Sequence, residues 1–132
     1  MPAMKVAFDE ADSEGIVFFG NYFRLAHRAL EQHLPTLGIP WEAWFKAVEF
    51  GVPLRHAEAE YLKPLRPGEE FSIAVKVADI GESSVKFEYE VNGPLGVCAR
   101  LKTSHVFVAR DAGPMRKVRI PDELRRKLQT GS

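Results

Sequence analysis

The hydrophobic period of this chain changes once, near residue 54. Before that point, apolar residues recur every three or four positions over residues 19–37, which predicts a long amphipathic helix. Gly20-Asn21 is its expected N-terminal cap, and Gly38 followed by Pro40 is its expected end. Beyond residue 54, apolar and polar residues alternate, which predicts consecutive antiparallel strands. This order predicts an α+β domain in which a sheet wraps one helix.

Proline and glycine interrupt the alternation and set the expected bounds of the elements. We expect strands over residues 5–8, 55–63, 70–80, 85–91 and 97–109, a short second helix over 41–48 and a final helix over 122–128. The turn between the last two strands is expected at Asn92-Gly93-Pro94. A length of 132 residues suits one domain, and no repeat or linker divides the chain. We therefore expect a single domain over residues 1–132.

The charge of the chain is balanced overall but unevenly distributed. Lys and Arg number 18, as do Asp and Glu, which argues against nucleic acid as the main partner. Residues 1–99 carry nine basic and fifteen acidic side chains, whereas residues 100–132 carry nine and three. A basic C-terminal third suits a phosphate-bearing small ligand or a simple solvated face, and charge alone leaves both interpretations open.

Cysteine content and hydropathy point to an ordinary intracellular protein. Cys98 is the single cysteine and sits in an apolar alternating stretch, which predicts a buried structural thiol. The sequence has no Cys/His cluster at zinc spacing, so we expect no metal site. It also has no leader-like N-terminus and no apolar run near the ~18 residues of a membrane span. We expect a cytoplasmic protein.

The segment ahead of the long helix has the composition of a reactive turn. Asp12 lies in a short polar stretch that Gly15 can turn, because glycine adopts positive φ without steric cost. A helix N-terminus follows, with unpaired backbone N–H groups and the positive end of the helix dipole. This arrangement can hold an oxyanion beside a carboxylate base or nucleophile. Composition alone also allows a simple helix cap.

Four segments of the sequence form a pattern when they are taken in order. The first comprises Phe8, Asp12, Gly15, Val17, Asn21 and Tyr22, and the others are residues 58–69, 79–84 and 103–108. In these segments the chain resembles the hotdog-fold acyl-CoA thioesterases of the 4-hydroxybenzoyl-CoA thioesterase group, and the resemblance covers about residues 5–125. It implies a five-stranded antiparallel sheet curled around the long helix. Two such subunits pair edge to edge, often as dimers within a homotetramer, with active sites at the dimer interface.

The resemblance also assigns catalytic roles to the turn. Asp12 matches the catalytic aspartate, which acts as nucleophile or as general base on water, and Gly15 forms the turn. The backbone N–H of Phe19 is the expected donor to the thioester oxygen. No cofactor is implied, because coenzyme A is part of the substrate. The absence of a Gly-x-Ser-x-Gly element agrees with a site that needs no serine nucleophile.

The expected acyl group is aromatic. Most family members carry Glu or Asp where this chain has His27, a neutral group that can face an aryl hydroxyl. Together with residues 53–56, His27 resembles the 1,4-dihydroxy-2-naphthoyl-CoA thioesterase branch. We expect Tyr22, His27 and His56 to contact the substrate, although His27 and His56 can equally be exposed histidines.

The expected coenzyme A contacts are Ser84 and Arg100, at positions where family members touch the nucleotide. Two alternatives remain open at this point. A short-chain aliphatic acyl-CoA thioesterase would keep the same chemistry with another acyl group. A non-catalytic acyl-CoA-binding domain is disfavoured, because binding alone does not require a carboxylate at Asp12.

Overall fold

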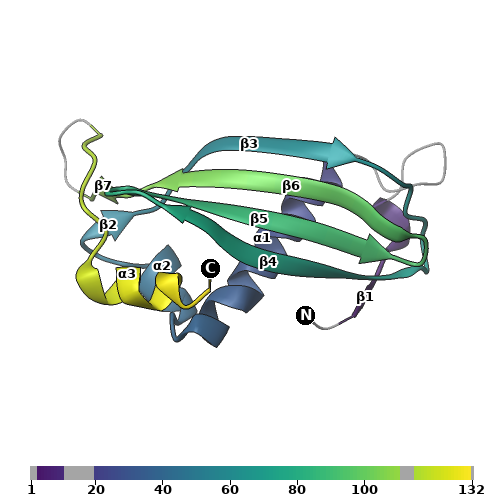
Figure 1. The fold of residues 1–132 in the computed structure, drawn as a ribbon, viewed down its shortest axis with the longest axis horizontal. Coiled ribbons are helices and arrows are strands. Elements are labelled where there is room, and N and C mark those ends of the chain that lie inside the picture. The colour runs from purple at the N-terminus through teal and green to yellow at the C-terminus, as the bar shows by residue number, and fades with distance from the viewer. Residues whose placement is uncertain (1–2, 11–19, 111–114, 132) are drawn as a thin grey trace.

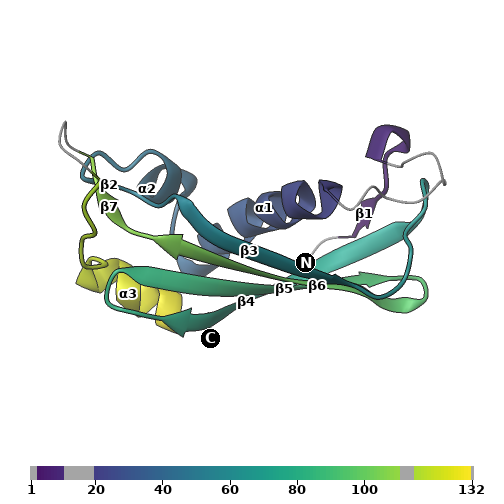
Figure 2. The same cartoon turned by 90° about the horizontal axis from the view of Figure 1, so that it is seen from above.

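The computed structural model describes residues 3–10, 20–110 and 115–131. These parts form an α+β domain in which one long helix lies across a curved five-stranded sheet (Figures 1 and 2). The strand order is β1-β4-β5-β6-β3, and every pairing is antiparallel. A separate two-stranded sheet joins β2 and β7. The predicted class and the predicted five-stranded sheet are both confirmed.

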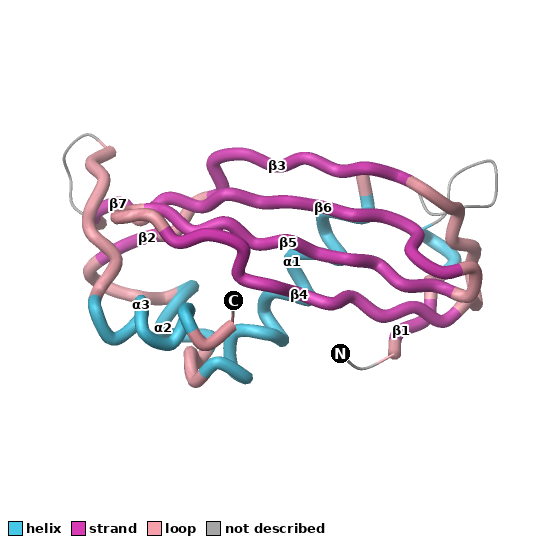
Figure 3. The backbone as a smooth tube through the Cα atoms, viewed as in Figure 1, coloured by secondary structure: helices cyan, strands magenta, loops and turns pink. Residues whose placement is uncertain are grey.

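Figure 3 traces the helices and strands along the chain. The strands are β1 (Met4–Lys5), β2 (Phe50–Gly51), β3 (Leu54–Tyr61), β4 (Glu70–Ile80), β5 (Ser84–Gly93), β6 (Gly96–Val106) and β7 (Val108–Ala109). The helices are α1 (Asn21–His33), α2 (Trp41–Phe45) and α3 (Asp122–Gln129), with 3-10 turns η1 (Phe8–Glu10) and η2 (Leu34–Leu37).

Helix α1 buries one stripe of its surface against the sheet, as its 3.6-residue period predicts. The buried side chains are Tyr22, Leu25, Ala26, Ala29 and Leu30. Gly20 is the N-cap but makes no side-chain cap bond, and the following η2 ends at Gly38, whose φ is +80°. The predicted stop is confirmed, because glycine adopts this left-handed backbone at little cost.

The sheet has one apolar and one charged face. Four alternating residues of β5, namely Val85, Phe87, Tyr89 and Val91, are buried, and α1 lies behind the sheet in Figure 1. The residues between them face outward, where charges of opposite sign alternate across the strands. Lys76 pairs in register with Glu88, Glu88 with Lys102, and Lys102 with Glu58. Such cross-strand pairs of opposite charge favour this register.

Several predicted bounds were wrong for identifiable reasons. The first strand was expected over residues 5–8, but the chain turns into η1 at Phe8. The last strand was expected as one piece to residue 109, but it breaks at Phe107. That N–H donates to the Ser83 carbonyl oxygen (2.7 Å), and the next two residues pair with β2. Asn92 and Gly93 belong to β5, since they pair with Val97 and Gly96, so the turn is tighter than expected.

Candidate functional site

The predicted catalytic residues Asp12, Gly15 and Phe19 lie outside the described residues. The residues that flank them on both sides are described and are bonded to each other. The Asn21 side-chain amide donates to the Glu10 carbonyl oxygen (2.9 Å), and the Arg24 guanidinium donates to the Glu10 carboxylate (2.5 Å). The other carboxylate oxygen accepts the backbone N–H of Ala7 (2.8 Å). The start of α1 is therefore joined to η1 at the base of the predicted catalytic turn.

His27 lies on α1 within an aromatic surface. Its side chain is 54% exposed, and its Nε2 is 3.1 Å from a carboxylate oxygen of Glu31, one turn along the helix. The Phe45 ring meets the His27 ring edge-on at 5.5 Å between centroids, and Trp41 packs on Phe45 at 5.6 Å. The imidazole thus combines a hydrogen-bonding group with a neighbouring apolar surface.

A buried polar chain lies on the apolar face of the sheet. Thr103 Oγ1 is 2.8 Å from the Tyr89 hydroxyl and 3.1 Å from His105 Nε2. Burial lowers the pKa of His105 to about 4; the backbone at Val52 opposes this shift, and the nearby His27 reinforces it. His105 is therefore neutral at neutral pH. His105 is buried with Tyr89 and Thr103.

Tyr22 is buried at the start of α1. It is 4% exposed, and its ring lies 5.2 Å from the ring of Tyr61 on the edge strand β3. Burial raises the pKa of Tyr22 to about 12, and the proximity of Cys98 and Tyr61 adds to the shift. Tyr22 thus remains a neutral hydroxyl. The Cys98 thiol is buried, as predicted, and burial raises its pKa as well.

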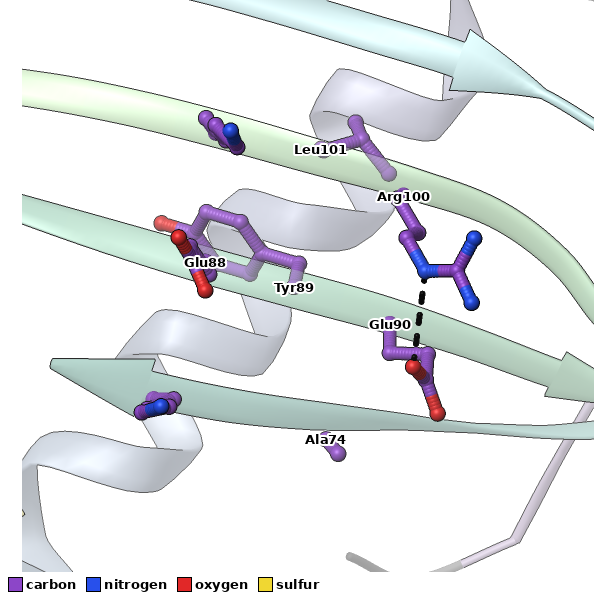
Figure 4. A pocket seen from close by; sticks show the side chains of 8 residues that line it. Ala74, Glu88, Tyr89, Glu90, Arg100 and Leu101 are labelled. Carbon is purple, nitrogen blue, oxygen red and sulfur yellow. Dashed lines mark ion pairs between the residues drawn. The ribbon is translucent and has the colours of Figure 1, made fainter. Parts of the chain in front are cut away.

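The two remaining predicted contacts of β3 and β6 lie on the outer face of the sheet. His56 shares that face with Glu58, and their side chains approach to 3.7 Å. Arg100 lies between Glu90 (3.7 Å) and Glu60 (3.9 Å), and Figure 4 shows it beside Glu90 with α1 behind the sheet. Within one subunit, the sheet separates His56 and Arg100 from His27 on α1.

Arg100 lines an open groove on this outer face. The groove has a volume of about 510 Å³ and contains both basic and acidic side chains, including Lys76, Lys102 and Glu88. Ser84 lies at the start of β5, where its carbonyl oxygen accepts the Gly81 N–H (2.8 Å) in the β4–β5 turn. The structure therefore does not gather Ser84 and Arg100 with Tyr22 and His27 into a single cluster of described residues.

In residues 3–10, 20–110 and 115–131, no three or more His, Cys, Asp or Glu side chains are gathered as a metal site would need. No helix in the described ranges has the length and apolar character to cross a membrane.

Comparison with known proteins identifies the fold and then the family. A solved structure from Aquifex aeolicus, of a hypothetical protein, superimposes with a TM-score of 0.85 at 28% identity, covering 96% of this chain and 97% of that one. A 1,4-dihydroxy-2-naphthoyl-CoA thioesterase from Synechocystis superimposes with a TM-score of 0.86 at 20% identity, covering 97% and 93%. The domain therefore has the hotdog fold.

Sequence comparison adds the family. A 1,4-dihydroxy-2-naphthoyl-CoA hydrolase from Nostoc punctiforme is 30% identical over 125 residues, which are 95% of this chain and 83% of that protein. The family model of the thioesterase-like superfamily matches residues 6–128, and the chain belongs to this superfamily. The resemblance predicted from the sequence is confirmed.

Proposed function

We propose that this protein is an acyl-CoA thioesterase that hydrolyses an aryl or hydroxyaryl thioester, of the 1,4-dihydroxy-2-naphthoyl-CoA or 4-hydroxybenzoyl-CoA type, to the free acid and coenzyme A. The observation that carries the proposal is the likeness to a 1,4-dihydroxy-2-naphthoyl-CoA hydrolase over 95% of this chain. The histidine at position 27, with Phe45 and Trp41 beside it, supports an aromatic acyl group.

In the proposed reaction, Asp12 acts on the thioester carbonyl carbon. As a nucleophile it displaces the coenzyme A thiolate and forms an acyl-aspartyl anhydride, which water then hydrolyses. As a general base it takes a proton from water while the oxygen of that water attacks the same carbon, and the C–S bond then breaks to release the coenzyme A thiolate. In both routes negative charge develops on the carbonyl oxygen, and the backbone N–H of Phe19 is its proposed donor. One such donor contributes about 3–4 kcal/mol. Gly15 allows the turn that brings the two together.

His27 is the proposed contact for the aryl hydroxyl. Its ring nitrogens can donate or accept a hydrogen bond, and its 54% exposure leaves it accessible from solvent. Tyr22 lies five residues earlier on α1, and its buried hydroxyl is a second proposed contact. His56 lies on the other face of the sheet, so its proposed contact is with a substrate bound at an interface between subunits.

A homodimer or homotetramer is proposed from the position of β3. This strand lies at the edge of the five-stranded sheet, and within the described chain it pairs with β6 alone. An eight-residue edge strand readily pairs with a second copy. Ser84 and Arg100 are the proposed coenzyme A contacts, and Arg100 would exchange a carboxylate partner for a phosphate. We further propose that the enzyme is cytoplasmic and needs no cofactor.

The experiment is a free-thiol release assay over a panel of acyl-CoA thioesters. The panel holds 1,4-dihydroxy-2-naphthoyl-, 4-hydroxybenzoyl-, benzoyl-, phenylacetyl-, butyryl- and palmitoyl-CoA. We expect the highest kcat/KM on a hydroxyaryl thioester. The highest kcat/KM on butyryl- or palmitoyl-CoA would replace the aryl assignment by an aliphatic one. Binding of acyl-CoA without hydrolysis of any member would place the protein among binding domains.

The role of His27 has its own control. His27→Ala should lower kcat/KM for 4-hydroxybenzoyl-CoA by about tenfold or more relative to benzoyl-CoA, since one hydrogen bond contributes about 1.5 kcal/mol. Gln32→Ala, on the same helix, should leave this ratio unchanged. Equal losses of kcat/KM on both substrates in His27→Ala would mean that His27 is an exposed surface residue without a contact to the aryl hydroxyl.

A further inference from the structure

A buried carboxylate, Glu10, ends the turn η1 at the point where the predicted catalytic turn leaves the described chain. The Glu10 side chain is 5% exposed, whereas the Arg24 side chain that pairs with it is 50% exposed. Burying a carboxylate is costly unless it is paired and hydrogen-bonded. Here both of its oxygens have partners, Ala7 N–H on one side and Arg24 on the other.

The Glu10 cluster, comprising Ala7, Glu10, Asn21 and Arg24, connects three parts of the fold. Residue 6 is held to the turn before β4, since Val6 N–H donates to the Glu69 carbonyl (3.0 Å) and Gly68 N–H donates to the Val6 carbonyl (2.9 Å). Ala7 then donates to the Glu10 carboxylate, and the Glu10 N–H donates back to the Ala7 carbonyl (3.1 Å). These bonds hold residue 10 in a defined position relative to the sheet.

From Glu10 the connection continues to α1 by two independent bonds. In one bond, the side-chain amide of Asn21 donates to the backbone carbonyl oxygen of Glu10. In the other, the Arg24 guanidinium donates to the Glu10 carboxylate. Asn21 is the first residue of α1, and Arg24 lies one turn further on the helix. The N-terminus of α1 is thereby fixed against residue 10, even though ten residues separate Glu10 from Asn21 in the sequence.

Asp12 follows Glu10 by two residues, and two residues of chain span at most about 7 Å. Phe19 precedes Asn21 by two residues. The same cluster therefore fixes the chain on both sides of the two groups that have to meet at one carbonyl. We propose that Glu10 is a positioning residue, which with Arg24 and Asn21 sets where the segment 11–20 stands relative to the N-terminus of α1, and hence the alignment of Asp12 with the oxyanion donor. The catalytic part of this inference rests on the proposed function.

A purely structural role makes a different prediction. Removing one member of a buried ion pair leaves the other without a partner, so a purely structural role predicts a lower free energy of unfolding and an unchanged kcat in the folded enzyme. A positioning role lowers kcat at nearly constant KM, because displacing a reacting group by about 1 Å can cost about 100-fold.

The experiment compares Glu10→Gln, Arg24→Met, their double variant and Arg24→Lys with wild type. Arg28→Met is the matched control, because Arg28 lies on the same helix, is exposed and makes no ion pair within the described residues. For each protein we would measure kcat and KM on the best aryl-CoA substrate, the urea midpoint of unfolding, and backbone hydrogen exchange over residues 11–20.

We expect Glu10→Gln and Arg24→Met to lower kcat by about 10- to 100-fold, with KM within about threefold of wild type. The double variant should be no worse than the worse single variant, because both changes remove one interaction. Arg24→Lys should restore part of kcat, since the positive charge is kept, and Arg28→Met should match wild type. A kcat within about twofold of wild type in folded Glu10→Gln and Arg24→Met would overturn the proposal.

Hydrogen exchange separates failure of this proposal from failure of the proposed function. If wild type hydrolyses no acyl-CoA, the proposed function fails, and exchange then decides the positioning claim alone. Faster exchange over residues 11–20 in Glu10→Gln and Arg24→Met, but not in Arg28→Met, would support it. Equal exchange in all three variants and wild type would overturn it.

Discussion

Replacing Thr103 by valine tests the buried polar chain on the apolar face of the sheet. Thr103 Oγ1 is the partner of both the Tyr89 hydroxyl and His105 Nε2, and all three residues are buried. Thr103→Val keeps the shape of the side chain and removes that oxygen. Two hydrogen bonds are lost, and two buried polar groups are left without a partner.

The expected cost follows from these contacts. Each hydrogen bond contributes about 1 kcal/mol, and each buried group left unpaired adds a penalty of its own, so we expect a loss of about 3 kcal/mol in the free energy of unfolding. For a chain of this length, that lowers Tm by about 10 °C. Thr103→Ser is the matched control, since it keeps the hydroxyl and removes one methyl group at a cost of about 1 kcal/mol.

Urea unfolding at pH 7.5 and a fixed protein concentration measures both variants. The urea midpoint of Thr103→Val should fall well below that of Thr103→Ser, with unchanged m-values. Tyr89→Phe should cost about 1 kcal/mol, because His105 keeps its contact with Thr103. A Thr103→Val variant as stable as Thr103→Ser would show that the Thr103 hydroxyl does not satisfy both groups.

Three further predictions concern pH and close packing. Burial lowers the pKa of His105 from 6.5 to about 4, so the unfolded chain binds a proton that the folded chain does not bind between these values. Stability contributed by neutral His105 is complete above pH 6.5 and falls by about 3 kcal/mol towards pH 4. The free energy of unfolding of His105→Gln, measured in urea, should lack this part of the pH dependence. Parallel plots of this free energy against pH for wild type and variant would contradict the pKa shift. A Cβ at Gly93 would lie 2.7 Å from both Cys98 Sγ and Leu65 Cδ2. Gly93→Ala should therefore lower the free energy of unfolding by about 1–3 kcal/mol. An unchanged Tm would contradict this close approach. Gly38→Ala has room at 3.8 Å but a φ of +80°, so it should cost about 1–2 kcal/mol by the same measurement, and a gain in stability would argue against the left-handed backbone.

Much of the fold could be predicted because its long elements carry their periods in their own residues. The strand over residues 70–80 was predicted with the bounds it has, and Gly38 ended the helical region as expected. The short sheet of β2 and β7 could not be predicted. Each of its strands has two residues, and the break at Phe107 depends on a hydrogen bond to Ser83 in a distant turn.

The candidate site also contains parts that the sequence predicts and parts that it does not. His56 and Glu58 share one face, as the two-residue period of a strand predicts. Which face this is required the structure, because the register shifts between Leu54 and His56. The pairing of Glu10 with Arg24 spans fourteen residues and follows no helical or strand spacing, so it required the structure. The position of His105 inside a long strand indicates a core or interface histidine from the sequence alone, whereas its contact with Thr103 required the structure.

The proposed mechanism requires that Asp12 drives hydrolysis of an aryl thioester of coenzyme A. The most direct measurement is the steady-state release of thiol from 1,4-dihydroxy-2-naphthoyl-CoA by wild type and by Asp12→Asn, a nearly isosteric change. The expected result is turnover by wild type and a loss of about 100- to 10,000-fold in kcat in the variant, with an unchanged urea midpoint and unchanged substrate binding. An unchanged kcat in Asp12→Asn would contradict the mechanism, and no turnover of any aryl-CoA by wild type would contradict the proposed function.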